Sequence, residues 1–371
     1  MLYKNVVFSI GLGILGTLML VMCTRNGSEN RDTDGPSTVI VRNHEGGGFF
    51  ANFSIINHCL HEHKQSEKKV VVLLDSGLYK EDRPQFIADN PHHNQYDWLS
   101  YYFEPINQTD KPLSYWKKCV DRHPLAQVIN SGGDSPQIFT VHSIKDYYAF
   151  DSNKDYYDEE FHRIWHKYFK LRPHIQKIVD GFKEKHDFTK KYVITFHYRG
   201  TDKYNTPHAY EDNHEHPPYE FCSALIRKKI KESGEPLSNI VTFIATDEQP
   251  FANYMKEANV NAVFIDAIRS DANTSDLNFA TAEKVHNTLP AQSVHLGMPD
   301  KSNYIKGRDV LVDAILLGSG NVFIKSRGNV SRQASWIGGP TIASIDLVNE
   351  FNAYKAKSAS GNDWKTIYSE L

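Results

Sequence analysis

The fold is decided by the stretch Tyr192-Val-Ile-Thr-Phe-His-Tyr-Arg-Gly-Thr-Asp-Lys203, in which an apolar run passes directly into polar and charged residues. The run Tyr192–Phe196 is nearly continuous in apolar residues. This pattern is typical of strands covered on both faces of a parallel α/β sheet. In such sheets, ligands bind just beyond the carboxyl ends of the strands. The residues that follow the strand are therefore candidates for ligand binding: His197, Arg199, Thr201, Asp202 and Lys203.

Other apolar runs of the same kind predict the rest of the strands. They are Thr38–Arg42, Lys69–Leu74, Ile240–Ala245, Ala262–Ile265, Asn321–Ile324 and Thr341–Ile345. Helical periodicity appears between several of them, at Phe221–Lys231, Phe251–Ala258 and Val310–Leu317. A longer periodic segment, Glu159–Lys185, contains Pro173, which should break the helix near its middle.

The length of the chain, 371 residues, suggests two domains at about 100–200 residues each. We expect an N-terminal α/β domain at 37–161, connecting helices at 162–189, a C-terminal α/β domain at 190–355 and a polar tail at 356–371. Lys and Arg number 42 and Asp and Glu 45, a net charge of −3 that argues against a nucleic-acid-binding surface. The hydrophobic content of 40% and the small net charge argue against global disorder.

The N-terminus carries an uncharged run, residues 5–24, that ends before Arg25. A helix of that length spans about 30 Å, which matches the apolar core of a bilayer. We therefore predict a transmembrane signal anchor at 1–24 and a polar stem at 25–36. A cleaved signal peptide, a lipoprotein signal ending at Cys23 and a buried helix of a soluble protein are the alternatives.

An anchor of this kind predicts a cytoplasmic N-terminus, with the body in the lumen of the Golgi or endoplasmic reticulum. In a bacterial host the body would lie outside the inner membrane. Asn-x-Ser/Thr triplets fit a secretory compartment, although such triplets also arise by chance. They begin at Asn26, Asn52, Asn107, Asn273 and Asn329. Four cysteines without a Cys-x-x-Cys pair exclude a disulfide-rich scaffold.

The polar residues after Phe196 have the chemistry of a phosphate site. The planar guanidinium of Arg199 suits a diphosphate in a bidentate manner, and Lys203 would add a second positive charge. Thr201 and Asp202 would hold the loop. A salt-bridged strand end, in which Asp202 simply pairs with Arg199, explains the same composition.

The motif His197-Tyr-Arg-Gly-Thr-Asp-Lys203 resembles the first motif of the fucosyltransferase superfamily: α-1,6-fucosyltransferases, nodulation fucosyltransferases and protein O-fucosyltransferases. The resemblance implies a GT-B fold, in which two Rossmann-like domains face each other across a cleft. It also implies that Arg199 binds the β-phosphate of GDP-fucose and that His197 contacts the nucleoside. Gly200 stands where the α-1,6 enzymes have a second Arg, and this departure bears on the acceptor more than on the donor.

Two more stretches resemble family motifs. In Val241-Thr-Phe-Ile-Ala-Thr-Asp-Glu248, the resemblance implies that Asp247 accepts hydrogen bonds from guanine, whereas the local sequence also suits a helix N-cap. In Gly307–Arg332, a polar turn opens a helix, and the resemblance implies that this turn meets the diphosphate and fucose. Free N–H groups at a helix N-terminus favour an anion there. Its candidate residues are Ser326, Gly328, Asn329 and Ser331. A plain helix cap is the alternative.

Two N-terminal features are less specific. The turn Glu45-Gly-Gly-Gly-Phe-Phe-Ala-Asn52 loosely matches a Gly-rich family loop that faces the donor, through Gly47, Gly48 and Asn52. The aromatic stretch Tyr96–Pro105 is predicted to form core and rim, with a sugar platform as the alternative.

The segment between Lys203 and Tyr219 is rich in His and acidic residues. Prolines make it a loop, and it lacks the spacing of a closed metal site, so we predict a surface loop over the donor site. The resemblance implies that an acidic residue of this loop is the catalytic base, which leaves Glu211, Asp212 and Glu215 as candidates. A metal site in the loop is the alternative.

The sequence thus predicts a membrane-anchored inverting glycosyltransferase that moves fucose from GDP-fucose to a glycan or protein acceptor. Arg199 would stabilise the departing GDP, and a loop carboxylate would deprotonate the acceptor. We expect no cofactor and no required metal, because Arg199 and Lys203 would neutralise the diphosphate. A non-catalytic relative that binds a glycan or nucleotide sugar, or a transferase using another nucleotide sugar, are the alternatives.

Overall fold

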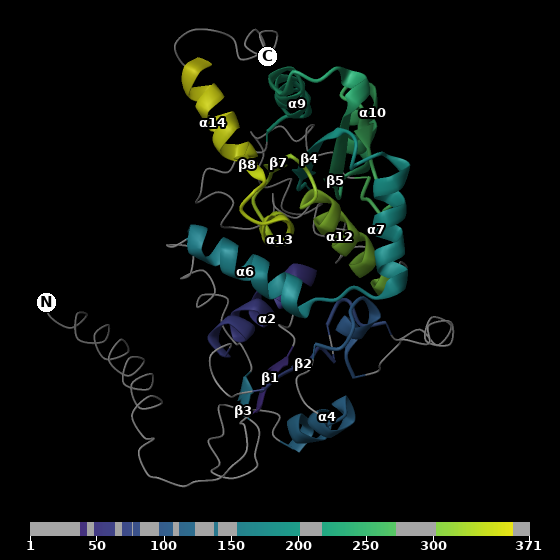
Figure 1. Cartoon of the computed structure of the whole chain (residues 1–371), viewed down its shortest axis with the longest axis vertical. Coiled ribbons are helices and arrows are strands. Elements are labelled where there is room, and N and C mark those ends of the chain that lie inside the picture. The colour runs from purple at the N-terminus through teal and green to yellow at the C-terminus, as the bar shows by residue number, and fades with distance from the viewer. Residues whose placement is uncertain are drawn as a thin grey trace, which may run out of the picture.

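The structure is a computed structural model that describes residues 38–42, 48–63, 69–75, 77–81, 96–106, 111–122, 137–139, 154–200, 217–271 and 302–358 (Figure 1). Within these ranges no helix has the length and apolar character needed to cross a bilayer. The predicted anchor at 1–24, the stem at 25–36 and the tail beyond residue 358 lie outside the described residues, so the anchor stays a prediction.

The N-terminal half is built on a small parallel sheet with strand order β2-β1-β3. Its elements in chain order are β1 (Thr38–Arg42), α2 (Phe49–His63), β2 (Lys69–Leu73), the 3-10 helix η1 (Trp98–Tyr101), α4 (Leu113–Arg122) and β3 (Gln137–Phe139). The sequence did not predict β3, which has only three residues. The aromatic stretch at 96–105 lies in the core as predicted, since Trp98, Tyr102 and Phe103 are fully buried.

Two helices connect the halves: α6 (Lys154–Tyr168) and α7 (Pro173–Lys185). The predicted break at Pro173 is confirmed. The preceding residue, Arg172, has extended backbone angles, φ −66° and ψ 148°, because the proline ring disfavours a helical conformation there. Proline itself begins α7, where its missing N–H has no intrahelical partner to lose.

The C-terminal half has a parallel sheet with strand order β6-β5-β4-β7-β8. Its elements are β4 (Tyr192–Tyr198), α9 (Tyr219–Ser233), η4 (Leu237–Asn239), β5 (Ile240–Thr246), α10 (Gln249–Glu257), β6 (Ala262–Val263), α12 (Asn303–Leu317), β7 (Val322–Lys325), α13 (Asn329–Gly338), β8 (Ala343–Asp346) and α14 (Leu347–Ser358). All strands predicted from apolar runs are present, and the α/β class with parallel sheets is confirmed.

Both faces of the C-terminal sheet are buried, which explains the continuous apolar runs. Side chains alternate between the faces along each strand. On one face, Ile194 and Phe196 of β4 pack in a core with residues of α9 and α10. On the other, Val193 of β4 and Phe243 of β5 join a core that includes α7 and α12 residues.

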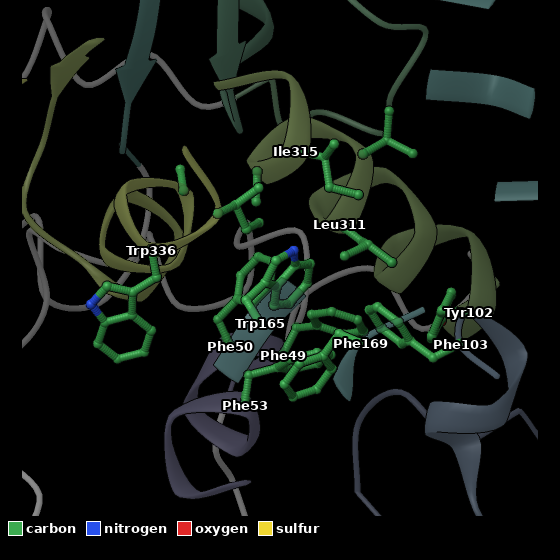
Figure 2. Close-up of a cluster of buried hydrophobic side chains, with 14 of the residues drawn as sticks. Phe49, Phe50, Phe53, Tyr102, Phe103, Trp165, Phe169, Leu311, Ile315 and Trp336 are labelled. Carbon is green, nitrogen blue, oxygen red and sulfur yellow. The ribbon is translucent and has the colours of Figure 1, made fainter. Parts of the chain in front are cut away.

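This second core extends into the N-terminal half (Figure 2). Helix α2 contacts both α6 and α13, and Figure 1 shows α2 and α6 between the small sheet and α13. Residues from both halves meet in Figure 2: Phe49, Phe50, Phe53, Tyr102, Phe103, Trp165, Phe169, Leu311, Ile315 and Trp336. The two halves therefore share one hydrophobic core.

Candidate functional site

Polar side chains from three neighbouring strands meet at the carboxyl edge of the C-terminal sheet. In the register, His197 of β4 lies opposite Ala245 of β5 and Lys325 of β7. The next residues of each chain segment, Arg199, Asp247 and Ser326, therefore come together beyond the strand ends. This is the edge at which α/β sheets bind ligands.

His197 is buried between two hydroxyl groups. Its Nδ1 lies 2.6 Å from Ser331 Oγ and 3.0 Å from Ser326 Oγ, and the Ser326 N–H donates to the His197 carbonyl. Burial, together with the nearby charge of Arg199, lowers the pKa of His197 to about 3. The imidazole is therefore neutral at physiological pH and connects β4 to the turn that opens α13.

Arg199 is fixed by Asp247. Its Nη1 lies 3.1 Å from Asp247 Oδ2, while the N–H of Gly200 donates to Asp247 Oδ1 at 2.9 Å. The partner that the salt-bridge interpretation gave Arg199, Asp202, lies outside the described residues. The N-cap interpretation of Asp247 is wrong, because the residue at the N-cap of α10 is Glu248 and Asp247 points instead to the end of β4.

Glu248 is a site residue that the sequence did not reveal. It is completely buried and accepts a hydrogen bond from the Tyr219 hydroxyl at 2.7 Å. A Cβ atom at Gly200 would collide with the Glu248 side chain. Gly200 thus packs against a buried carboxyl group at the N-cap of α10, and any larger residue at this position would require the Glu248 side chain to move.

The turn before α13 leads into a helix that no side chain of the described residues caps. Gly328 stands at the N-cap with φ +147°, a conformation that favours glycine, and it has no side chain to cap the helix. Among the described residues, no side chain caps the first N–H groups of α13, from Asn329 onward, and such groups favour an anion. This arrangement favours the ligand-binding interpretation of the turn over the plain helix cap.

Two of the remaining predicted residues lie at the start of α2, and the others lie outside the described residues. Gly48 precedes α2, and Asn52 lies in the first turns of that helix, 2% exposed, with its amide donating to the Gly48 carbonyl at 3.3 Å. The amide of Asn52 is thus engaged within its own helix. Several candidates lie outside the described residues and stay predictions: Gly47, Thr201, Asp202, Lys203, Glu211, Asp212 and Glu215.

No group of three metal-binding side chains occurs within the ranges that the structure describes. The expectation that the site works without a metal remains a prediction, because the loop between Lys203 and Tyr219 is largely outside those ranges. Positive charge at the described site comes from Arg199 and from the N-terminus of α13.

No protein-family model and no curated protein sequence matches the chain. Solved structures do. NodZ α-1,6-fucosyltransferase soaked with GDP-fucose is 17% identical with a TM-score of 0.45, over 82% of this chain and 93% of that one. The chain is similar in structure to fucosyltransferases.

Two more solved structures give the same result. Fucosyltransferase NodZ from Bradyrhizobium is 14% identical with a TM-score of 0.44, over 81% of this chain and 92% of that one. POFUT1 in complex with GDP-fucose is 11% identical with a TM-score of 0.38, over 85% and 99%. The solved structures found in the comparison are thus fucosyltransferases, the superfamily that the sequence motifs resemble.

Proposed function

We propose that the chain is an inverting glycosyltransferase that moves fucose from GDP-fucose to a glycan or protein acceptor. The observation that carries the proposal is the convergence of Arg199, His197 and the uncapped N-terminus of α13 at the carboxyl edge of one parallel sheet. A guanidinium and a helix N-terminus are both groups that bind the diphosphate of a nucleotide sugar.

Each group has a distinct role in the proposed reaction. Arg199 and the α13 N–H groups stabilise the negative charge that develops on the departing GDP, and Asp247 holds Arg199 in place beforehand, so that little reorganisation is needed. His197, neutral and hydrogen-bonded to Ser326 and Ser331, positions the turn. Asp247 has both carboxylate oxygens engaged in this state, so its proposed contact with guanine needs a lone pair that remains free.

The acceptor side of the proposal rests on the loop after Lys203. A carboxylate there, Glu211, Asp212 or Glu215, removes the proton of the acceptor hydroxyl as fucose passes through an oxocarbenium-like transition state. Thr201, Asp202 and Lys203 complete the donor loop, with Gly47, Gly48 and Asn52 on the opposite side. In this proposal the reaction requires no metal cation, because Arg199 and Lys203 neutralise the diphosphate.

We also propose that residues 1–24 anchor the protein in a membrane, with the catalytic body in the lumen of the Golgi or endoplasmic reticulum or outside a bacterial inner membrane. The support is the uncharged run of residues 5–24. Recovery of the full-length chain in the soluble fraction after carbonate extraction would contradict this part of the proposal.

A thermal-shift panel of nucleotide sugars, followed by a turnover assay with GDP-fucose, tests the function. We expect GDP-fucose and GDP to raise the melting temperature of the full-length chain more than UDP-sugars do, and we expect GDP release in the presence of a suitable acceptor. Binding without turnover would favour a non-catalytic relative. A larger shift with another nucleotide sugar would favour a transferase with a different donor.

A further inference from the structure

Helix α6 carries three polar side chains that meet the C-terminal end of α13. Asp158, His162 and His166 are four residues apart, so they lie on one face of α6, and α6 packs against α13 (Figure 1). The Trp336 indole Nε1–H donates to Asp158 Oδ1 at 2.8 Å. His162 Nδ1 lies 2.9 Å from the Trp336 carbonyl oxygen, and His166 Nε2 lies 3.0 Å from the Ile337 carbonyl oxygen. All three side chains therefore bond the last turn of α13.

The carbonyls that face the two histidines are groups that a helix cannot satisfy by itself. The last four carbonyls of an α-helix have no partner within the helix. In α13, the Ser335 carbonyl accepts from the Gly339 N–H at 2.8 Å, and the next two carbonyls, those of Trp336 and Ile337, meet the imidazoles of α6. A carbonyl oxygen is an acceptor alone, so the ring nitrogen that faces it carries a proton in either charge state of the ring.

The backbone at the end of α13 leaves room for His162. Gly339, at the C-cap, has φ +78°, a conformation that favours glycine. A Cβ atom at this position would lie 2.7 Å from Nδ1 and Cε1 of His162. Gly234, at the C-cap of α9, has a similar φ of +70°, but a Cβ there would meet no atom within 4 Å. The close approach of an imidazole thus distinguishes Gly339 from Gly234.

The C-terminal end of α13 is also held by α12. A Cβ atom at Gly338 would lie 2.6 Å from the Gly318 carbonyl oxygen, so the two backbones are in close contact. This contact limits the distance between α12 and α13. The hydrogen bonds from α6 are directional, so they limit the rotation of α13 about its own axis.

Helix α13 is short enough for one end to determine the direction of the other. It has ten residues and is therefore about 15 Å long. Near its N-terminus, Ser331 Oγ lies 2.6 Å from Nδ1 of His197 at the sheet edge. Contacts that fix the last turn of α13 therefore also fix the direction of its first N–H groups and the place of Ser331 beside His197.

We propose that His162 and His166, together with Asp158, are positioning residues for the donor diphosphate. Through the C-terminal end of α13, they hold the N–H groups at its N-terminus in the orientation that binds the phosphates. The inference rests on the proposed function, because it requires a nucleotide at the N-terminus of α13. It gives a role in donor binding to α6, a helix that also packs against α2 of the N-terminal half.

Amide substitutions test the two hydrogen bonds separately, because the histidines use different ring nitrogens. Nδ1 of His162 is attached to Cγ, as the amide nitrogen of asparagine is, whereas Nε2 of His166 lies one atom further out, as the amide nitrogen of glutamine does. Both side chains are at least partly exposed, so the fold should tolerate an amide.

Calorimetric titration of GDP into the full-length variants gives the readout. His162→Asn and His166→Gln keep the donor in place and should bind GDP within about twofold of the wild type. His162→Gln and His166→Asn misplace the donor, so GDP affinity should fall about threefold to tenfold.

Gly339→Ala and Gly234→Ala form a matched pair that reaches the same contact from α13. Each places a side chain at a left-handed φ, so both should lower the melting temperature. Gly339→Ala also displaces His162, so GDP affinity should fall in this variant. Gly234→Ala should leave GDP affinity unchanged.

GDP affinity equal to the wild type in His162→Gln, His166→Asn and Gly339→Ala would overturn the inference, because the contacts would then contribute to stability alone. So would an equal loss of affinity in all four histidine variants, or in Gly339→Ala and Gly234→Ala alike, because neither pattern depends on the hydrogen bonds. A folded wild-type chain that binds no GDP would contradict the proposed function itself, and the inference with it.

Discussion

His197 and Arg199 show how single residues are tuned at the sheet edge. The imidazole is held neutral by burial while the guanidinium beside it keeps its charge and a carboxylate partner. Positive charge is thus concentrated on Arg199, and His197 acts through hydrogen bonds to Ser326 and Ser331. These two neighbouring residues differ in role because one side chain is desolvated and the other is paired.

The lowered pKa of His197 predicts acid sensitivity. The folded state keeps the imidazole neutral down to about pH 3, whereas the unfolded chain binds a proton below about pH 6.5. The stability contributed by His197 is therefore present above pH 6.5 and is lost as the pH falls toward 3, by a few kcal/mol in total.

Urea unfolding of the wild type and of His197→Gln at pH 7 and pH 4.5 measures this effect. We expect the stability difference between the two proteins to shrink or reverse at pH 4.5. The comparison of variants is needed because Asp97, whose pKa burial raises to about 7, contributes with the opposite sign in both proteins. Equal losses of stability in both proteins would show that His197 does not titrate in this way.

Gly200 predicts a steric coupling with Glu248. Gly200→Ala places a methyl group against a buried carboxylate and should destabilise the fold by about 1–3 kcal/mol. Combining it with Glu248→Gly should recover part of that loss, because the colliding side chain is gone. The melting temperatures of both single variants and the double variant give the coupling, and purely additive effects would contradict it.

At the scale of helices and strands, the sequence predicted what local patterns determine. The apolar runs located the strands, and Pro173 located the boundary between α6 and α7. The start of α12 was predicted at Val310, whereas the helix begins at Asn303. Its first two turns are polar and carry Gly307, where a Cβ would collide with Tyr102. They are held by contacts with the N-terminal half, which periodicity does not reveal.

In the candidate site too, some residues could be predicted from local sequence and others could not. Residues directly after strands, such as Arg199 and Asp247, were found because parallel strands end at a common edge. The pairing of these two and the burial of Glu248 depend on packing between segments far apart in the chain. Contacts between such distant segments cannot be predicted from a short sequence motif.

A change at the N-terminus of α13 should lower ligand affinity beyond what a general loss of stability explains. Gly328→Ala forces a side chain into φ +147°, which should cost about 1–3 kcal/mol of stability and turn the N–H groups away from the anion. GDP affinity should therefore fall. Gly234, at the C-cap of α9 with φ +70°, is the matched control.

Gly234→Ala should lower the melting temperature while leaving GDP affinity unchanged, since the α9 C-cap is not part of the sheet edge. The two variants are compared by thermal unfolding and by GDP titration. An equal drop in affinity for both would indicate that general destabilisation, and not the α13 turn, controls binding.

At the scale of the whole molecule, the two halves are joined by more than the linker helices. The Tyr102 hydroxyl donates to the Tyr304 carbonyl at 3.0 Å, and the two rings are stacked with their centroids 5.5 Å apart. Glu81 accepts from Ser302 Oγ at 2.9 Å and from Asn303 N–H at 3.1 Å, so the N-terminal half supplies a hydrogen-bond acceptor to the start of α12.

This interface predicts that the halves unfold together. Phe53→Ala, in the shared core, should destabilise the fold by about 3–5 kcal/mol. Hydrogen exchange should then show β1 and β2 amides losing protection to the same extent as those of β4 and β5. Loss confined to the N-terminal sheet would show that the halves are independent.

The central claim, a nucleotide site built on Arg199, is tested most directly by titrating GDP into the wild type and Arg199→Lys. Lysine keeps the charge but loses the planar fork that pairs with Asp247 and a diphosphate. The account predicts that the wild type binds GDP and that Arg199→Lys binds it at least about tenfold more weakly, with an unchanged melting temperature. Near-normal GDP affinity in Arg199→Lys would contradict it.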